Sequence, residues 1–114
     1  MRSRAEALAR EVGLPETSWT KPVADLDAAG WLRVRFGRAI ALDPAILLLE
    51  HASARLARER VAALGAEMRT VAAGRGIALV AATADETFAR AVAARVLTLE
   101  PASGRLREQR RRWF

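Results

Sequence analysis

Cysteine is absent from this chain of 114 residues, and lysine occurs once, as Lys21. The lack of cysteine excludes disulfide bonds and thiolate metal sites. No apolar run approaches the length of a membrane-spanning helix, and the residues after Met1 contain no apolar core of a signal peptide. We therefore expect no membrane span and no secretory signal, and these absences are compatible with the reducing cytoplasm.

Aromatic residues are also scarce, at 5% of the chain, and tyrosine is missing. Alanine, leucine and valine must therefore build most of the core, and alanine contributes little buried area per residue. A chain of this length also buries a smaller share of its surface than a larger domain does. The composition is more typical of one layer of a larger body than of a self-sufficient domain.

The positive charge is concentrated at the C-terminal end. The net charge is +6, and residues 105–114 hold five arginines and one acid, which makes five minus one, or +4. A basic tail of this kind can contact nucleic acid or anionic lipid, and the adjacent Trp113 and Phe114 could rest on a membrane surface. A solvated chain end is the simpler interpretation, so we predict a basic tail over 105–114.

The first third of the chain is predicted to be mainly helical. Apolar residues at helical spacing predict a helix over 2–12, and a loop rich in proline, serine and threonine follows over 14–25. Asp27 is a good N-cap for a second helix over about 28–42, which Pro44 closes.

Short apolar runs alternate with helical patterns in the rest of the chain. The runs over 45–49, 76–82 and 95–100 suit strands, the first two of them buried on both faces. Helices are expected over 57–73 and 85–94. This order predicts an α/β fold with a parallel sheet and flanking helices. Because a three-stranded parallel sheet normally needs more neighbours, we expect that strands are missing from it.

The order and spacing of these elements resemble the ATP-binding domain of ABC transporters. The strongest stretch is 38–49, which reads RAIALDPAILLL and matches the helix after the family's signature motif and the Walker B strand. The resemblance runs from about Val23 to Arg105 and implies a partial P-loop NTPase-like fold with three βαβ-type strands. It divides the chain into part of a helical subdomain at 1–44, an α/β core at 45–104 and the basic tail.

A signature-like segment stands before the second predicted helix, as Asp27, Ala28, Ala29 and Gly30. In the family, amides of this segment bind the γ-phosphate of ATP held by a partner subunit. Asp27 departs from the family's serine and brings a carboxylate to that position, which repels phosphate at close range. From the residues alone, Asp27 is better interpreted as a helix cap.

The resemblance assigns further roles at the ends of the predicted strands. Glu50 takes the Walker B aspartate position, where it would hold Mg²⁺ through water. His51 replaces the family's catalytic glutamate, and histidine can act as a base near neutral pH. Ser53 lies in the D-loop-like segment, and Ala84 takes the position of the switch histidine. From the residues alone, Glu50 and His51 are equally well interpreted as the end of a strand and the start of a loop.

The phosphate-binding loop G-x-x-x-x-G-K-S/T occurs nowhere in the sequence. Without it there is no nest of backbone amides for the phosphates. In the family this loop lies in the N-terminal half, so the chain resembles a C-terminal half. The implied cofactors are ATP and Mg²⁺. The implied partners are the rest of a cassette or a second cassette, and a membrane permease subunit, with a cytoplasmic location at the inner face of the membrane.

Three functions stay open from the sequence. The first is a truncated or degenerate ATP-binding subunit of an ABC transporter, which would not hydrolyse ATP as an isolated chain. The second is a non-catalytic interaction or regulatory protein built on the same fold remnant. The third and weakest is a nucleic-acid binder that uses the arginines of 105–114, which predicts strongly salt-dependent binding.

Overall fold

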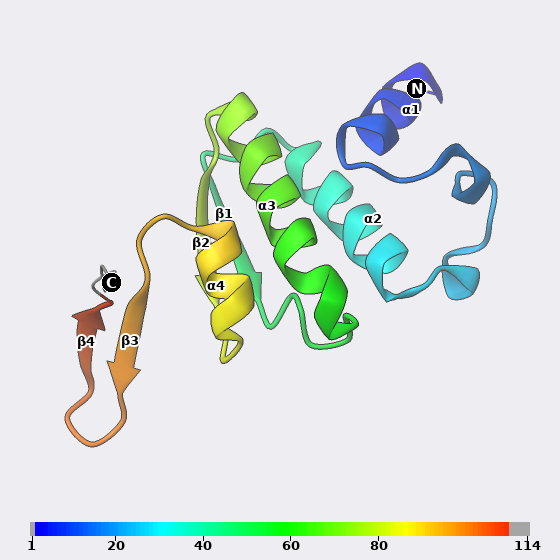
Figure 1. Ribbon diagram of the computed structural model, residues 1–114. Coiled ribbons are helices and arrows are strands. Elements are labelled where there is room, and N and C mark those ends of the chain that lie inside the picture. The colour runs from blue at the N-terminus through cyan, green and yellow to red at the C-terminus, as the bar shows by residue number, and fades with distance from the viewer. Residues whose placement is uncertain (1, 110–114) are drawn as a thin grey trace.

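The computed structural model describes residues 2–109. Within this range, four α-helices and four β-strands follow one another along the chain (Figure 1). Their bounds are α1 Arg2–Glu11, α2 Ala28–Ile40, β1 Ile46–Glu50, α3 Arg58–Arg75, β2 Ala78–Ala82, α4 Glu86–Val92, β3 Leu97–Glu100 and β4 Arg105–Glu108. Short 3₁₀ turns, η1 Glu16–Ser18 and η2 Val23–Asp25, lie between α1 and α2. The predicted α/β class is confirmed.

β1 and β2 form a two-stranded parallel sheet, with Ile46 opposite Ala78 and Glu50 opposite Ala82. α3 connects the two strands, as a parallel pair requires a crossover. α3 and α4 both contact β2, and they pack extensively against each other. The helices therefore form a layer over one face of this small sheet (Figure 1).

The other face of the sheet is bare among the described residues. Successive side chains of a strand point to opposite faces. Leu47 and Leu49 face the core, whereas Ile46, Leu48 and Val80 are 66%, 64% and 52% exposed. The prediction that both runs are buried on both faces is therefore wrong. The described helices cover only one face, and each strand has one neighbour.

The third predicted strand does not join the parallel sheet. β3 pairs with β4 in an antiparallel hairpin, with Leu97 opposite Glu108 and Glu100 opposite Arg105. Gly104 closes the turn with a φ of +68°, a conformation that glycine adopts without strain. The turn brings β4 directly beside β3, which gives the backbone of β3 a local partner. The expected parallel pairing of this strand is therefore wrong.

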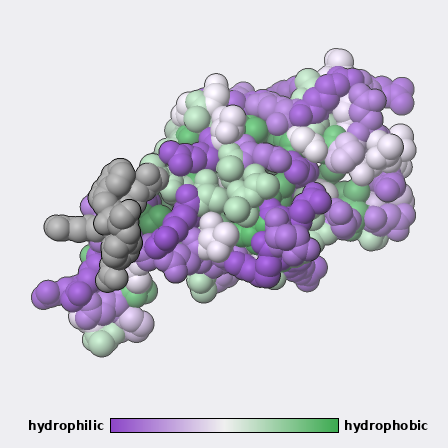
Figure 2. All heavy atoms as spheres, in the orientation of Figure 1, coloured by the Kyte–Doolittle hydropathy of each residue, from purple (hydrophilic) through white to green (hydrophobic). Residues whose placement is uncertain are grey.

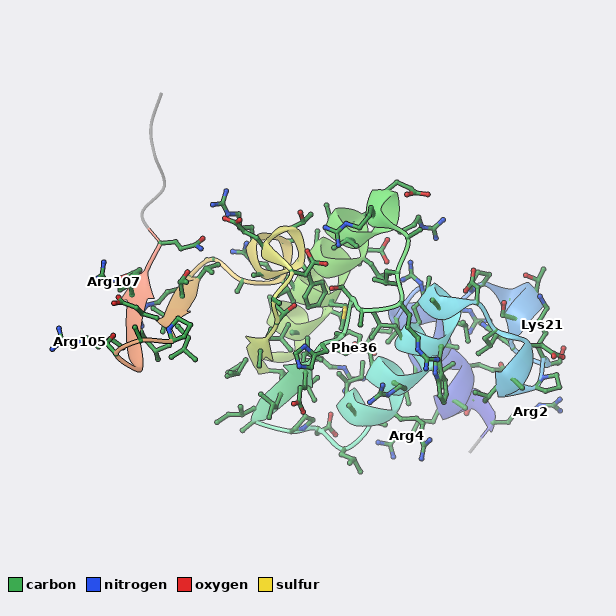
Figure 3. All side chains as sticks on the ribbon, turned by 90° about the horizontal axis from the view of Figure 1, so that it is seen from below. Arg2, Arg4, Lys21, Phe36, Arg105 and Arg107 are labelled. Carbon is green, nitrogen blue, oxygen red and sulfur yellow. The ribbon has the colours of Figure 1, made fainter. Side chains whose placement is uncertain are left out.

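The first residues of the predicted basic tail form the strand β4, and all four of its residues are exposed to solvent. The hairpin extends from the body at the end opposite to α1 (Figure 1). Arg105 and Arg107 project from it, far from Arg2 and Lys21 at the other end of the molecule (Figure 3). Residues 110–114 of the predicted tail lie outside the described part of the chain.

The core lies between the helices and the covered face of the sheet. Ile40 of α2, Val61 of α3 and Phe88 of α4 are completely buried. Phe36 points from α2 into the body (Figure 3) and is 4% exposed. The apolar spacing of α3 that was predicted from the sequence thus faces the core.

Arg75, the last residue of α3, attaches α1 to this core. Its Nε donates to Glu11 Oε1 at 2.6 Å, and its Nη1 donates to the Ile40 carbonyl at 3.0 Å and to Asp43 Oδ1 at 2.8 Å. The hydrogen bonds from Arg75 lower the pKa of Glu11. Because α1 itself contains no buried residue, this polar contact and the buried Val12 that follows α1 hold the helix in place.

The helical face of the molecule is largely hydrophilic. Figure 2 shows hydrophilic residues over much of this face, with hydrophobic residues in smaller patches between them. Of the helices between residues 2 and 109, none is both long enough and apolar enough to cross a bilayer.

Candidate functional site

A cleft of about 500 Å³ lies where β1 and β2 end. Because the two strands are parallel and in register, the loops that follow Glu50 and Ala82 meet at one edge of the sheet. His51 begins the first loop with a φ of +49°, and its backbone N donates to the Ala82 carbonyl at 3.0 Å. This left-handed conformation turns the chain out of the strand and into the cleft.

Asp85 is the centre of a hydrogen-bond network in the cleft. Its Oδ2 accepts from Ser53 Oγ at 2.7 Å and from Arg58 Nη1 at 2.7 Å. Its Oδ1 accepts from Arg58 Nη2 at 3.1 Å and from the Phe88 backbone N at 3.2 Å. The carboxylate therefore joins the loop after β1, the start of α3 and the start of α4.

These donors keep Asp85 ionised. The hydrogen bonds from Arg58 and then from Ser53 hold the pKa of Asp85 well below its ordinary value. The same contact raises the pKa of Arg58. Ser53 is buried, and its only hydroxyl proton is directed at Asp85. Ser53 therefore positions the loop and is not arranged as a nucleophile with an adjacent base.

The structure brings together three of the residues that the sequence assigned to a site. His51, Ser53 and Ala84 all line the cleft. Glu50 is exposed and does not line it. By strand alternation, Glu50 shares the bare face of the sheet with Leu48. The predicted Glu50–His51 pair is therefore divided between the bare face and the cleft.

The signature-like segment lies away from the cleft, at the start of α2. Asp27 Oδ1 accepts a hydrogen bond from the Gly30 backbone N at 2.7 Å, which confirms the predicted helix cap. Ala28 and Ala29 are partly buried against the core. The segment is not among the residues that line the cleft, so its predicted contact with nucleotide stays a prediction.

Arg58 is the cleft residue that the sequence reasoning missed. It is the first residue of α3, where a positive charge is unfavourable because the N-terminus of a helix carries a partial positive charge. That mismatch was the available signal, since an arginine at such a position needs a carboxylate from elsewhere. Asp85 was expected at the start of a helix, and it is the N-cap of α4.

The electrostatics of the cleft do not suit ATP and Mg²⁺ on these residues alone. Arg58, the one formally charged cation that lines the cleft in the described chain, is already paired with Asp85. Glu86 adds a second carboxylate, which pairs with Arg90 at 2.6 Å. Within residues 2–109, no group of three or more His, Cys, Asp or Glu side chains could hold a metal ion. Phosphates would therefore meet carboxylates and few available donors.

Comparison with known proteins gives one curated relative. The chain is similar to part of an ATP-binding protein. Over 99 residues it is 35% identical to the methionine import ATP-binding protein MetN of Leifsonia xyli subsp. xyli (strain CTCB07). The aligned residues make up 87% of this chain and 29% of that protein, so the chain spans less than a third of its relative's length.

No protein-family model matches the chain. No solved structure matches it either. The similarity to MetN agrees with the expected resemblance to ATP-binding domains, and the roles assigned to single residues stay predictions.

Proposed function

We propose that this chain is one part of an ABC-type ATP-binding unit, whose role is ATP binding and hydrolysis coupled to transport. The observation that carries the proposal is the 35% identity to a methionine import ATP-binding protein over 87% of this chain. The activity belongs to the complete unit. The isolated chain would not hydrolyse ATP, because it lacks a phosphate-binding loop and its cleft offers few donors for phosphate.

Within that unit, the cleft at the ends of β1 and β2 is this chain's share of the nucleotide site. We assign the altered base to His51, the D-loop-like contact to Ser53 and the switch position to Ala84. Glu50 would be the carboxylate nearest to Mg²⁺. The segment from Asp27 to Gly30 would face nucleotide held by a second cassette.

The exposed apolar face of the sheet supports the proposal that another polypeptide completes the ATP-binding unit. Ile46, Leu48 and Val80 expose apolar side chains on one face of a two-stranded sheet. A contiguous exposed apolar patch on a protein often marks a site of interaction with another molecule. A polypeptide that covers it would also reach Glu50 at the end of the same face, and could supply the missing phosphate-binding loop. A membrane permease subunit is a further proposed partner of the complete unit.

The test measures binding of a fluorescent ATP analogue with Mg²⁺. The purified chain is compared with a mixture that also contains a polypeptide corresponding to the part of MetN outside the aligned residues. We expect no saturable binding by the chain alone and saturable binding by the mixture. Leu48→Lys should abolish this binding, because it places a charge on the bare face.

A matched control is Leu106→Lys, since Leu106 on the hairpin is 61% exposed and Leu48 is 64% exposed. This variant should bind like the wild type. A mixture that never binds nucleotide would overturn the proposal. Saturable binding by the chain alone, lost in Glu50→Ala, would instead show that the chain contains a complete site of its own.

A non-catalytic interaction protein is the second candidate, and the charge of the cleft favours it. Asp85 and Glu86 line a cleft whose arginine is already paired. This candidate predicts that the chain associates with its partner in size-exclusion chromatography, that Leu48→Lys prevents the association, and that no nucleotide binds to the complex.

A further inference from the structure

The outer edge of β2 carries backbone groups that have no strand beside them. The backbone N of Ala78 donates to the Ala45 carbonyl at 3.0 Å, so Ala78 turns its backbone groups toward β1. Along a strand, the N–H and C=O groups of successive residues point to opposite sides. Those of Leu79 and Ala81 therefore point away from β1, where no described strand pairs with β2.

The outer edge of β3 is unpaired in the same way. The Gln109 backbone N donates to the Val96 carbonyl at 2.9 Å, which makes these two residues a hydrogen-bonded pair. Hydrogen-bonded and non-hydrogen-bonded pairs alternate along an antiparallel ladder. The N–H and C=O groups of Leu97 and Leu99 therefore point away from β4, which is the one partner of β3 within residues 2–109.

The two unpaired edges are turned toward each other. Figure 1 shows that β3 runs in the same direction as β1 and β2 and lies beyond β2, with β4 on its far side. The hairpin lies to the side of the parallel sheet in the view from below as well (Figure 3). In the described chain, neither the helices nor the parallel sheet packs extensively against it.

The connection from β2 to β3 indicates that both belong to one sheet. α4 joins them, and a helical crossover is the connection that parallel strands of one sheet use. A helix with its side chains is about 10 Å wide and neighbouring strands lie about 4.8 Å apart, so one crossover helix spans about two strand spacings. A crossover of this width joins strands that have one further strand between them.

We propose that a parallel strand of a second polypeptide inserts between β2 and β3 and forms backbone hydrogen bonds with both. This strand is apolar, because its side chains extend the covered row of Leu79 and Ala81 on one face and the bare face with Val80 on the other. Since it runs parallel to β2, it ends at the edge of the sheet where the cleft lies. The inference rests on the proposed function and specifies how the completing polypeptide joins this chain.

Amide hydrogen exchange, resolved by NMR on the ¹⁵N-labelled chain, tests the insertion. In the isolated chain, exchange should be fast at the two unpaired edges, which means at the amides of Leu79, Ala81, Leu97 and Leu99. The amides of Val80 and Thr98 are paired inside their sheets and should exchange slowly. An unlabelled polypeptide corresponding to the part of MetN outside the aligned residues should slow all four edge amides by at least about tenfold.

Two proline variants separate the edge contact from the fold of the hairpin. Leu99→Pro removes one edge donor and leaves the hairpin ladder intact, because the Leu99 N–H points away from β4. Leu106→Pro is the matched control, since Leu106 lies opposite Leu99 with its N–H on the far edge of β4, and the two residues are 61% and 59% exposed. Leu99→Pro should weaken binding of the polypeptide by at least about tenfold, and Leu106→Pro should bind like the wild type. Slow exchange at Thr98 reports that the hairpin is folded in both variants.

The proposal is overturned if the edge amides stay unprotected in the mixture, or if only those of β2 become protected. Equal binding by Leu99→Pro and Leu106→Pro would also overturn it. Nucleotide binding by the mixture without protection of Leu97 and Leu99 would remove the inserted strand and leave the proposed function standing. Protection of both edges without nucleotide binding would support the inserted strand and count against the proposed function.

Discussion

Gly65 is the point at which α3 comes closest to α4. A Cβ atom at this position would lie 2.8 Å from Ala91 Cβ, 3.4 Å from Phe88 Cδ2 and 3.5 Å from the Val92 backbone N. The first of these distances is too short for two carbon atoms. The substitution Gly65→Ala must therefore push the two helices apart or distort them.

The size of the effect follows from two opposing contributions. Alanine stabilises a helix interior relative to glycine by about 0.5–1 kcal/mol. Overpacking a close contact costs about 1–3 kcal/mol. With a central cost of about 2 kcal/mol and a gain of about 1 kcal/mol, Gly65→Ala should lower the free energy of unfolding by about 1 kcal/mol.

Gly74 provides the control in the same helix, because a Cβ there would meet nothing within 4 Å. Gly74→Ala should raise the free energy of unfolding by about 0.5–1 kcal/mol. Urea unfolding followed by far-UV circular dichroism measures both variants. If Gly65→Ala is as stable as Gly74→Ala, α4 does not pack against α3 at this point and the described core is wrong.

Three further substitutions test other parts of the structure. Asp27→Ala removes the N-cap of α2 and should cost about 1 kcal/mol in urea unfolding, whereas an unchanged midpoint would mean that the cap does not form. Phe88→Ala empties a completely buried position and should cost about 3–5 kcal/mol by the same measurement, and a loss below about 1 kcal/mol would contradict its burial. Asp85→Asn should destabilise the chain at neutral pH. Because the folded pKa of Asp85 is lowered, its stabilising effect is complete above the unfolded pKa near 3.9 and declines as the pH falls from there toward the folded pKa. The difference between wild type and variant should therefore be constant at neutral pH and shrink in acid, and a difference that grows in acid would reverse the assigned sign.

The parts of the fold that could be predicted are those that are determined by interactions within a short segment of sequence. The cap at Asp27 and the apolar spacing of α3 both depend on residues close in sequence. The exposure of Ile46 and Leu48 could not be predicted from the sequence, because it depends on whether another layer covers this face of the sheet. A continuous apolar run indicates a strand with two covered faces, and the described chain covers one.

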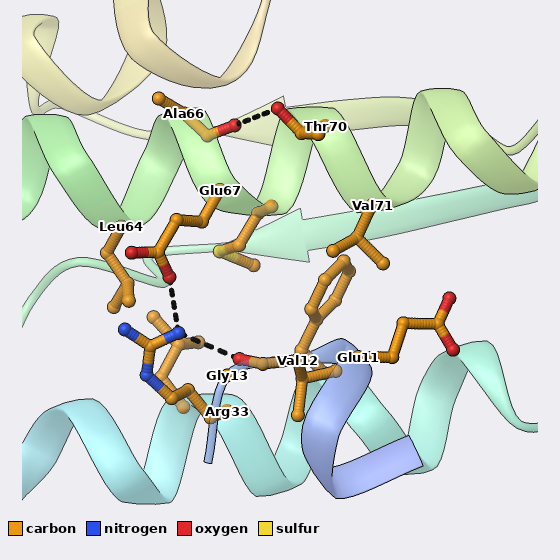
Figure 4. A pocket seen from close by; sticks show the side chains of 12 residues that line it. Glu11, Val12, Gly13, Arg33, Leu64, Ala66, Glu67, Thr70 and Val71 are labelled. Atoms are coloured by element: carbon orange, nitrogen blue, oxygen red, sulfur yellow. Dashed lines mark hydrogen bonds and ion pairs between the residues drawn. The ribbon is translucent and has the colours of Figure 1, made fainter. Parts of the chain in front are cut away.

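The same distinction applies to the candidate site. His51, Ser53 and Ala84 line one cleft at the edge of the sheet, because the ends of neighbouring parallel strands meet there, and their assigned roles stay predictions. Strand alternation places Glu50 on the bare face, so it does not line the cleft with His51, and its assigned role stays a prediction. The link from Arg58 to Asp85 crosses 27 residues of sequence and has no local pattern. In the helical layer, the hydrogen bonds from Arg33 of α2 to the Val12 carbonyl and to Glu67 (Figure 4) were likewise invisible before the helices were packed.

The two-stranded parallel sheet has a consequence for the chain while it is being made. Each of its strands has a single partner among the described residues, so both outer edges carry backbone groups that face away from the sheet. The segment from Ile46 to Leu49 carries no charge. Pro44 lies two residues before it and Glu50 directly after it, and a proline and a charge near such a segment oppose association between strands of different copies. Without another polypeptide at these edges, newly made copies can pair with one another. The yield of soluble protein should therefore fall as the concentration of free chains rises.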